Sequence, residues 1–212
     1  MIDLKDVRIF RNKTPILKTI SLQNQRGECV ALMGLNGSGK STLLKTLLGL
    51  HLDYEGQISL KGNLLKSPSS LNIAYLPEKF KACGTLTGQQ FLDFFQDAYE
   101  DLENTLKFPK DSLSKQIKTY SKGMLQKLGL IHFFAQNNEL KIADEIMSGL
   151  DFKTRHAVQT LIKKQISEGV TFLFTKHTHQ DACAVASRLL YLESGNITFD
   201  GPPKNWSESL AA

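Results

Sequence analysis

Short apolar runs alternate with amphipathic stretches along most of this chain. The first residues alternate between apolar and polar side chains, which predicts a strand with one buried face at residues 2–9 and a second strand at 17–22. Residues 29–33 form a continuous apolar run between two glycines, as in a strand buried on both faces. The same signals predict further strands at residues 56–60, 72–76, 139–145 and 170–174, followed by a hairpin at 188–199.

Apolar residues at helical spacing separate these strands. A helix is expected from Lys40, with leucines at positions 43, 44, 47 and 48 on one side. Thr87 and Gln90 form a capping box at the start of a second helix, and the segment from there to about His132 is expected to be mainly helical. Apolar positions 158, 161, 162 and 166 predict a longer amphipathic helix, and a short helix is expected at 182–186.

Strands that alternate with helices predict an α/β domain with a mostly parallel sheet. The length of 212 residues fits one domain with a sizeable core, residues 1–212. The helical stretch at residues 79–132 is expected to be an insertion, so that residues 1–78 and 133–212 form the core of the domain.

Composition narrows the class of protein. With 41% hydrophobic and 22% charged residues the chain has an ordinary globular composition, and no apolar run approaches the ~20 residues that span a bilayer. The first ten residues lack the apolar stretch of a secretory signal, so a cytosolic location is expected. The net charge of +5 indicates a solvated basic face, or else a face that contacts phosphates or an anionic membrane surface. Cys29, Cys83 and Cys183 have no metal-ligand spacing and are expected to be reduced and buried.

The stretch GLNGSGKST fits the pattern G-x-x-x-x-G-K-[ST] and lies between a predicted buried strand and a predicted helix. Glycines allow successive backbone N–H groups to point into one concavity at the helix N-terminus, where phosphate binds. Lys40 is expected to place its ammonium against the β and γ phosphates, and Ser41 to offer its hydroxyl to Mg²⁺. We predict a nucleoside triphosphate and magnesium site composed of Gly34, Asn36, Gly37, Ser38, Gly39, Lys40, Ser41 and Thr42.

A second predicted strand ends in two acids, Asp144 and Glu145, within LKIADEIMSGLD. In a parallel sheet the C-terminal end of this strand lies beside the phosphate loop. Asp144 is then expected to bind Mg²⁺ directly or through water, and Glu145 to orient the attacking water or accept its proton.

Taken together, these motifs resemble those of the ATPase subunit of ATP-binding cassette (ABC) transporters, over essentially the whole chain. GLNGSGKS matches the Walker A motif, LKIADE matches Walker B, and SGLD, with Ser148 and Asp151, matches the D-loop. In TKHTH, His177 stands at the place of the switch histidine, while His179 is expected to start the next helix. YSKGMLQK matches the family's signature motif, which would present Ser121, Lys122, Gly123 and Met124.

The resemblance implies a P-loop ATPase fold with an N-terminal antiparallel β subdomain and an inserted helical subdomain that carries the signature. It implies that ATP and Mg²⁺ bind between two ATPase subunits, Walker A of one facing the signature of the other, with a homodimer expected. A separate integral membrane permease subunit would be the other partner, with no nucleic acid, and the chain would lie peripherally at the inner face of the membrane. For the adenine contact the family pattern allows Phe10 or Arg11, and Phe10 also fits a core position.

Four positions depart from the family pattern. Glu78 replaces the Q-loop glutamine, and its carboxylate still permits a contact with Mg²⁺. In the signature, Lys122 replaces a glycine and Met124 replaces a glutamine. Ile146 replaces the proline that usually follows Walker B. Similar variants occur in ATPases of bacterial exporters, so export is expected. Because Glu145 and His177 are present, hydrolysis is expected rather than binding alone.

Two other functions remain open at this level, an ABC-type ATPase without a membrane partner and a regulatory nucleotide-binding subunit. In the family, a short helix of the membrane permease docks in a groove, and the matching stretch here is residues 79–99. The aromatic and leucine residues of this stretch either line that groove or form a small core of the helical subdomain. The candidates are Phe80, Leu86, Phe91 and Phe95.

Overall fold

The computed structural model describes residues 1–65, 72–94, 99–176 and 179–207. Near the N-terminus, β1 (Ile2–Arg11), β2 (Thr14–Asn24), β4 (Tyr54–Leu60) and β5 (Asn63–Leu64) form a four-stranded antiparallel sheet in the order β2-β1-β4-β5. The predicted alternation holds, since the apolar residues of β1 are buried and its intervening residues are mostly exposed. The β1–β2 hairpin turns at Asn12 and Lys13, which both have positive φ, as in the turn that best matches strand twist.

A six-stranded sheet forms the centre of the molecule in the order β10-β9-β3-β8-β7-β6. Its strands β9, β3, β8, β7 and β6 are parallel to their neighbours, and β10 pairs antiparallel with β9. All residues of β3, β7 and β8 are buried, as expected for strands covered on both faces. The bounds are β3 (Cys29–Gly34), β6 (Ile73–Leu76), β7 (Leu140–Ala143), β8 (Thr171–Thr175), β9 (Arg188–Glu193) and β10 (Asn196–Gly201).

Helices cover both faces of this sheet. Successive residues of β3 belong to different hydrophobic clusters: Val30 and Leu32 pack with α1 (Lys40–Leu47) and the antiparallel sheet, while Ala31 and Met33 pack on the other side. That second cluster includes residues of α4 (Lys122–Ala135) and α5 (Phe152–Ser167), and α6 (His179–Val185) contributes Ala182. The fold is therefore the predicted α/β arrangement, with the start of α6 at His179 as expected.

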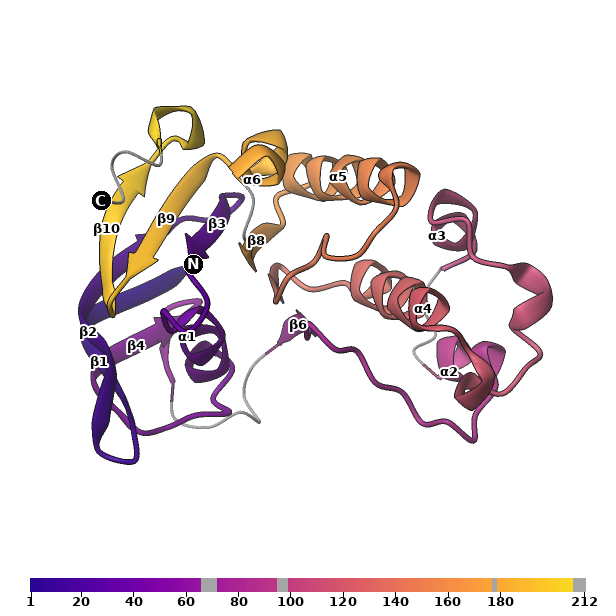
Figure 1. Ribbon diagram of the computed structural model, residues 1–212, viewed down its shortest axis with the longest axis horizontal. Coiled ribbons are helices and arrows are strands. Elements are labelled where there is room, and N and C mark those ends of the chain that lie inside the picture. Colours follow the sequence, from indigo (N-terminus) through magenta and orange to yellow (C-terminus); the bar gives the residue numbers. More distant parts are fainter. Residues whose placement is uncertain (66–71, 95–98, 177–178, 208–212) are drawn as a thin grey trace.

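The segment between β6 and β7 lies on the far side of the molecule from the antiparallel sheet (Figure 1). It is less helical than predicted: α2 (Gly88–Asp93) and α3 (Glu100–Thr105) are short, and 3₁₀ turns precede α4. Lys107 has a positive φ and Pro109 cannot donate a backbone hydrogen bond, so a continuous helix cannot pass this point. The predicted capping box at Thr87 and Gln90 is confirmed at the start of α2.

The inserted helices are packed onto the sheet through a shared hydrophobic cluster. Leu92 of α2 and Leu128 of α4 belong to the same cluster as Ala143 of β7. Helix α4 continues to Ala135, whereas the sequence predicted that the insertion ends at residue 132. Among the described residues, no helix has the length and apolar character needed to cross a membrane.

The three cysteines are free thiols, as expected, but their predicted burial is wrong for two of them. Cys29 is buried in β3, whereas Cys83 and Cys183 are exposed. Both lie outside regular apolar spacing, Cys83 in the loop before α2 and Cys183 on the outer side of the short helix α6, so residue type alone misplaced them.

Candidate functional site

The phosphate loop connects β3 to α1, and its backbone is accommodated only by glycine at two points. Gly34 has φ 148°, and a Cβ at this residue would lie 2.2 Å from the carbonyl oxygen of Leu192 in the neighbouring strand β9. Gly39, at the start of α1, has φ 106°, and a Cβ there would lie 2.5 Å from Cδ2 of Leu17. The loop backbone therefore lies directly against β9 at Gly34 and against Leu17 of β2 at Gly39, where a side chain would not fit.

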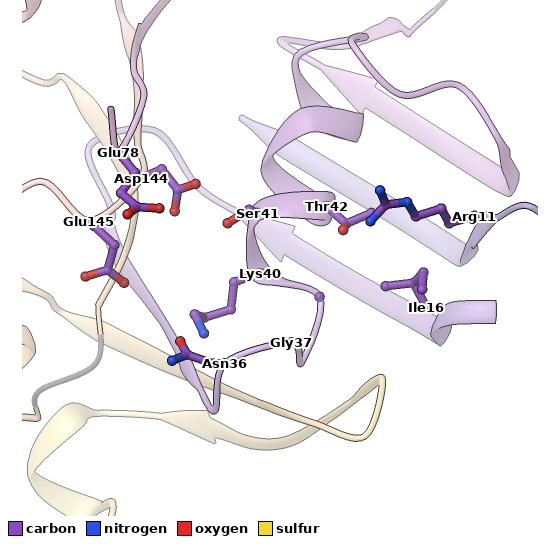
Figure 2. A pocket seen from close by; sticks show the side chains of 11 residues that line it. Arg11, Ile16, Asn36, Gly37, Lys40, Ser41, Thr42, Glu78, Asp144 and Glu145 are labelled. Carbon is purple, nitrogen blue, oxygen red and sulfur yellow. The ribbon is translucent and has the colours of Figure 1, made fainter. Parts of the chain in front are cut away.

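A cavity of about 240 Å³ opens above this loop. Figure 2 shows its walls: the loop and the first turn of α1 on one side, and a group of carboxylates on the wall opposite Ser41. It is lined by Arg11, Ile16, Asn36, Gly37, Gly39, Lys40, Ser41, Thr42, Glu78, Asp144 and Glu145. The structure therefore brings most of the predicted Walker A and Walker B residues together, whereas Gly34 and Ser38 are buried and do not line the cavity.

Lys40 is held inside the loop rather than extended into solvent. It is 7% exposed, and its ammonium donates to the carbonyl oxygens of Gly34 at 2.8 Å and Leu35 at 2.9 Å. Burial lowers the pKa of Lys40, and the nearby carboxylates of Glu145 and Asp144 act in the opposite direction. The ammonium is thus fixed where the oxygens of a phosphate chain would replace or join the two carbonyls.

The two acids, Asp144 and Glu145, directly follow β7, which ends at Ala143. Asp144 is buried, and its Oδ1 accepts a hydrogen bond from the hydroxyl of Thr175 at 2.6 Å. The backbone N–H of Glu145 donates to the same hydroxyl oxygen at 2.8 Å, and Glu145 has a φ of 57°. A left-handed conformation is costly for a residue with a side chain, so the site maintains it through surrounding contacts.

Thr175 is a residue that sequence reasoning missed. It ends β8, the strand next to β7, and β8 pairs with β3 on its other side, so its hydroxyl is placed between the phosphate loop and the acids. A polar residue at the end of a buried apolar strand was the available signal.

The two candidates for the adenine contact differ in their position relative to the cavity. Arg11 and Ile16, from the β1–β2 hairpin, line the cavity, but Phe10 does not. The backbone of Phe10 bonds to the next loop: its N–H donates to Asp53, and its carbonyl oxygen lies 2.6 Å from Nε2 of His51. Of the two alternatives the structure brings Arg11, not Phe10, to the site.

The signature residues lie at the start of α4, outside this cavity. Ser121 caps the helix, its hydroxyl oxygen accepting a hydrogen bond from the N–H of Met124 at 3.2 Å. Ser121, Lys122 and Gly123 are exposed, and within the described ranges a Cβ on Gly123 would have no heavy atom within 4 Å apart from its chain neighbours and the nearby backbone of its own helix. Nothing inside the described chain thus requires a glycine at this position.

The D-loop residues connect the signature helix to α5. The side chain of Gln126 on α4 donates to the carbonyl oxygen of Ser148 at 2.5 Å. Asp151 caps α5, accepting hydrogen bonds from the N–H of Thr154 at 2.9 Å and from its hydroxyl at 2.6 Å, and these bonds lower the pKa of Asp151.

Two predicted residues, His177 and Phe95, lie outside the described residues. Of the other docking candidates, Phe80, Leu86 and Phe91 are half-buried and pack against the main cluster. Phe80 and Phe91 form an edge-to-face ring pair at 5.9 Å. These three residues therefore belong to the core of the inserted segment, and the predicted docking role for them stays open.

Comparison with known sequences identifies the family. A family model described as "ABC transporter" matches residues 17–148. The chain belongs to the ABC transporter ATP-binding family. Among curated ABC proteins it is 32% identical over 209 residues to an uncharacterized ABC transporter ATP-binding protein of Synechocystis, a match that covers 91% of this chain and 58% of that one. It therefore spans less than two thirds of the length of that relative.

Other ABC relatives carry different transport names. The chain is 30% identical to the manganese transport system ATP-binding protein MntB of Bacillus subtilis, covering 96% of this chain and 87% of that one. It is 29% identical to the Nod factor export ATP-binding protein I of Neorhizobium galegae, in a match that covers 99% of this chain and 64% of that one.

Solved ABC structures share the fold. One titled as the ATP-binding subunit of an ABC transporter matches with a TM-score of 0.91 and 26% identity, over 100% of this chain and 98% of that one. A dimeric cassette described as a post-hydrolysis state bound to ADP and Pi matches with a TM-score of 0.83 and 21% identity. The match covers 97% of this chain and 100% of that one. The predicted fold class, an ABC-type P-loop ATPase, is thereby confirmed.

Proposed function

We propose that this ABC protein binds and hydrolyses Mg²⁺-ATP and that this reaction drives transport across a membrane. The observation that carries the proposal is the single cavity that unites the phosphate loop, Lys40 and the carboxylates of Asp144 and Glu145. Its volume of about 240 Å³ and its cationic and backbone donors suit a triphosphate chain, and its carboxylates suit the metal ion that accompanies it.

Magnesium fits the oxygen donors of this site. Ser41 and Asp144 offer hard oxygen ligands, which Mg²⁺ prefers, and Glu78 adds a third oxygen group on the same wall. Among the described residues, no group of three or more His, Cys, Asp or Glu is arranged to hold a metal ion by itself. We therefore assign the ion to a site shared between Ser41, Asp144 and the phosphates, where it would neutralise charge on the phosphate oxygens.

Each functional group of the site is assigned a separate role in ATP hydrolysis. Lys40 and the loop N–H groups hold the β and γ phosphates in place. Thr175 fixes the backbone at Glu145, so the carboxylate is positioned to orient water and take its proton as the γ-phosphate bond breaks. His177 remains the proposed switch residue that senses the γ-phosphate.

The signature is proposed to act on the nucleotide of a second subunit. Ser121, Lys122, Gly123 and Met124 lie away from the chain's own phosphate loop, and the exposed Gly123 leaves its helix N-terminus open to a ligand. Paired subunits in head-to-tail arrangement would place each signature on the partner's ATP, with Ser148 and Asp151 at the same interface. Since each chain carries one copy of every motif, a homodimer would contain two complete sites.

A separate membrane permease is the proposed second partner, with the chain bound peripherally at the inner face of the membrane. Residues 79–132 would act as the helical signature unit on a core of 1–78 and 133–212. The exporter-type variants Glu78 and Lys122 favour export. Among the relatives, one is named for Nod factor export and another for spermidine/putrescine import, so the names alone do not decide the direction.

ATP hydrolysis by the purified chain tests the proposal. We expect the wild type to release phosphate in a Mg²⁺-dependent manner and Lys40→Ala to lose ATP binding and turnover. Unchanged ATP affinity in Lys40→Ala would overturn the phosphate-site assignment. Co-purification with an integral membrane protein separates the transport function from an ABC-type ATPase without such a partner. A wild type that binds ATP and releases no phosphate would indicate a regulatory subunit instead.

A further inference from the structure

Three charged side chains form a cluster next to the end of β8. The ammonium of Lys176, the residue that follows β8, lies 3.1 Å from Oδ2 of Asp181 on α6. The other carboxylate oxygen, Oδ1, lies 3.7 Å from Nη1 of Arg155 on α5. The helices α5 and α6 lie side by side (Figure 1). Asp181 thus contacts two cations that come from different segments of the chain.

These three residues do not line the nucleotide cavity, the one above the phosphate loop. The side chains of Lys176 and Asp181 are only 6% and 7% exposed, so their ion pair is buried. Replacing a buried ion pair by apolar residues is often neutral for stability or even stabilising. Stability is therefore a weak reason for charge at these two positions, and a role in positioning explains it better.

Lys176 directly follows Thr175, whose hydroxyl holds both acids of the site. The backbone N–H of Lys176 donates to the carbonyl oxygen of Leu32 on β3 at 3.1 Å, so the backbone is still paired with the sheet here. Successive residues of an extended chain point to opposite sides. Thr175 accordingly bonds to Asp144, whereas Lys176 pairs with Asp181. Holding the lysine on one side restrains the rotation that would turn the threonine hydroxyl away on the other.

Arg155 contacts the second oxygen of the Asp181 carboxylate and connects it to the D-loop. Its Nη2 also donates to the carbonyl oxygen of Leu150 at 3.4 Å. The side chain of Arg155 is 40% exposed, so solvent screens its attraction to Asp181 more strongly than that of Lys176. We therefore expect Lys176 to be the stronger partner and Arg155 to help fix the rotation of the carboxylate.

We propose that Lys176 and Asp181 are positioning residues for ATP hydrolysis and that they act through Thr175. Their ion pair holds the residue after β8, so that the hydroxyl of Thr175 stays on the carboxylate of Asp144 and on the N–H of Glu145. This inference rests on the proposed function and adds residues that support its acids from outside the cavity. Loss of the pair should slow turnover and leave MgATP binding unchanged.

Steady-state ATPase kinetics of the full chain test this effect. Lys176→Met removes the ammonium and keeps a long side chain. We expect the turnover number to fall about tenfold and the Michaelis constant for MgATP to change by less than about twofold. Lys176→Arg keeps the cation and should retain most of the turnover. Lys163→Met, on the exposed side of α5, is the control for a lost lysine and should turn over as the wild type does.

A double-mutant cycle with Thr175→Val tests whether the pair acts through that hydroxyl. Without the hydroxyl there is nothing for Lys176 to position, so Lys176→Met should lower turnover by less than about twofold further. An equal loss in both backgrounds would mean an independent effect and would contradict the proposal. Wild-type turnover in Lys176→Met, or a loss that appears in the Michaelis constant instead, would contradict it as well.

An apolar pair, Lys176→Met combined with Asp181→Leu, separates positioning from stability. Because such replacements often keep the stability of the fold, urea denaturation should give a midpoint at or above that of Lys176→Met. The turnover number should nevertheless stay about tenfold below that of the wild type. Wild-type turnover in this double variant would mean that an unpaired carboxylate alone harms the single variant, and it would exclude the positioning role.

Amide hydrogen exchange gives a measurement that does not depend on turnover. The N–H of Glu145 donates to Thr175, so it should exchange about tenfold faster in Lys176→Met and at the wild-type rate in Lys163→Met. An unchanged exchange rate at Glu145 in Lys176→Met would overturn the inference. Failure of the proposed function is seen separately, as a wild type that releases no phosphate while this exchange still responds to Lys176.

Discussion

The hydroxyl of Thr175 donates to Oδ1 of Asp144 at 2.6 Å and accepts from the backbone N–H of Glu145 at 2.8 Å. One side chain on β8 thereby fixes both acids that follow β7. Thr175→Val keeps the shape of the side chain and removes both bonds. We expect the turnover number to fall about 10- to 100-fold, as for other outer-shell partners of metal-site ligands.

Thr175→Ser retains the hydroxyl and is the matched control for this substitution. Steady-state ATPase kinetics should show most of the wild-type turnover in Thr175→Ser. Wild-type turnover in Thr175→Val would mean that the acids are held by other contacts.

Glu145 is expected to be needed for hydrolysis and not for ATP binding. Glu145→Gln keeps the size of the side chain and removes its ability to accept a proton. We expect phosphate release to fall by at least about 100-fold while ATP affinity is kept, and we expect an ATP-bound dimer to accumulate in size-exclusion chromatography. Hydrolysis at the wild-type rate in this variant would show that Glu145 is not the base.

Lys141 anchors the C-terminal end of the signature helix. It is 1% exposed on β7, and its ammonium donates to the carbonyl oxygens of Phe133 at 2.9 Å and Phe134 at 3.1 Å. The side chain of Gln165 also donates to Phe134, so Phe133 depends more strongly on Lys141. Lys141→Met should lower the free energy of unfolding by about 1–3 kcal/mol, because a buried carbonyl loses its donor.

Urea denaturation measures this loss, with Lys163→Met on the exposed face of α5 as the control. The control should shift the free energy of unfolding by less than about 0.5 kcal/mol. If Lys141→Met were as stable as the wild type, the buried ammonium would contribute no more than an apolar side chain does.

The three thiols should differ in reactivity. Burial raises the pKa of Cys29 to about 12, whereas the hydrogen bond from Thr85 lowers the pKa of the exposed Cys83. A lowered pKa places more thiolate at a given pH, so alkylation of Cys83 should begin at a lower pH than alkylation of an ordinary thiol. Cys29 should stay unmodified until the protein unfolds.

Mass spectrometry of iodoacetamide-treated Cys183→Ser, followed from pH 6 to 9, isolates these two thiols. Thr85→Val removes the donor and should move the Cys83 profile to higher pH. Modification of Cys29 in the native protein would contradict its burial.

The sequence by itself determined the order of strands and helices, the phosphate loop and the acidic strand end. These features rest on local signals, such as alternation at residues 2–9, the continuous apolar run at 29–33 and the fixed spacing of glycines before Lys40. Local signals failed where packing decides: the aromatic residues after Thr87 fitted a long helix, yet the chain breaks into short pieces around Lys107 and Pro109.

Only the tertiary structure decided which distant residues share a site. Thr175 meets Asp144 because β8 lies between β3 and β7, a neighbour relation that spacing along the chain does not encode. The position of Arg11 in the lining of the nucleotide cavity, with Phe10 outside it, depends on the turn of a hairpin, and the cavity that Glu78 and Lys122 both line depends on where α4 packs. Local sequence thus set the chemistry of each segment, and burial of the shared core set which of those segments face one another.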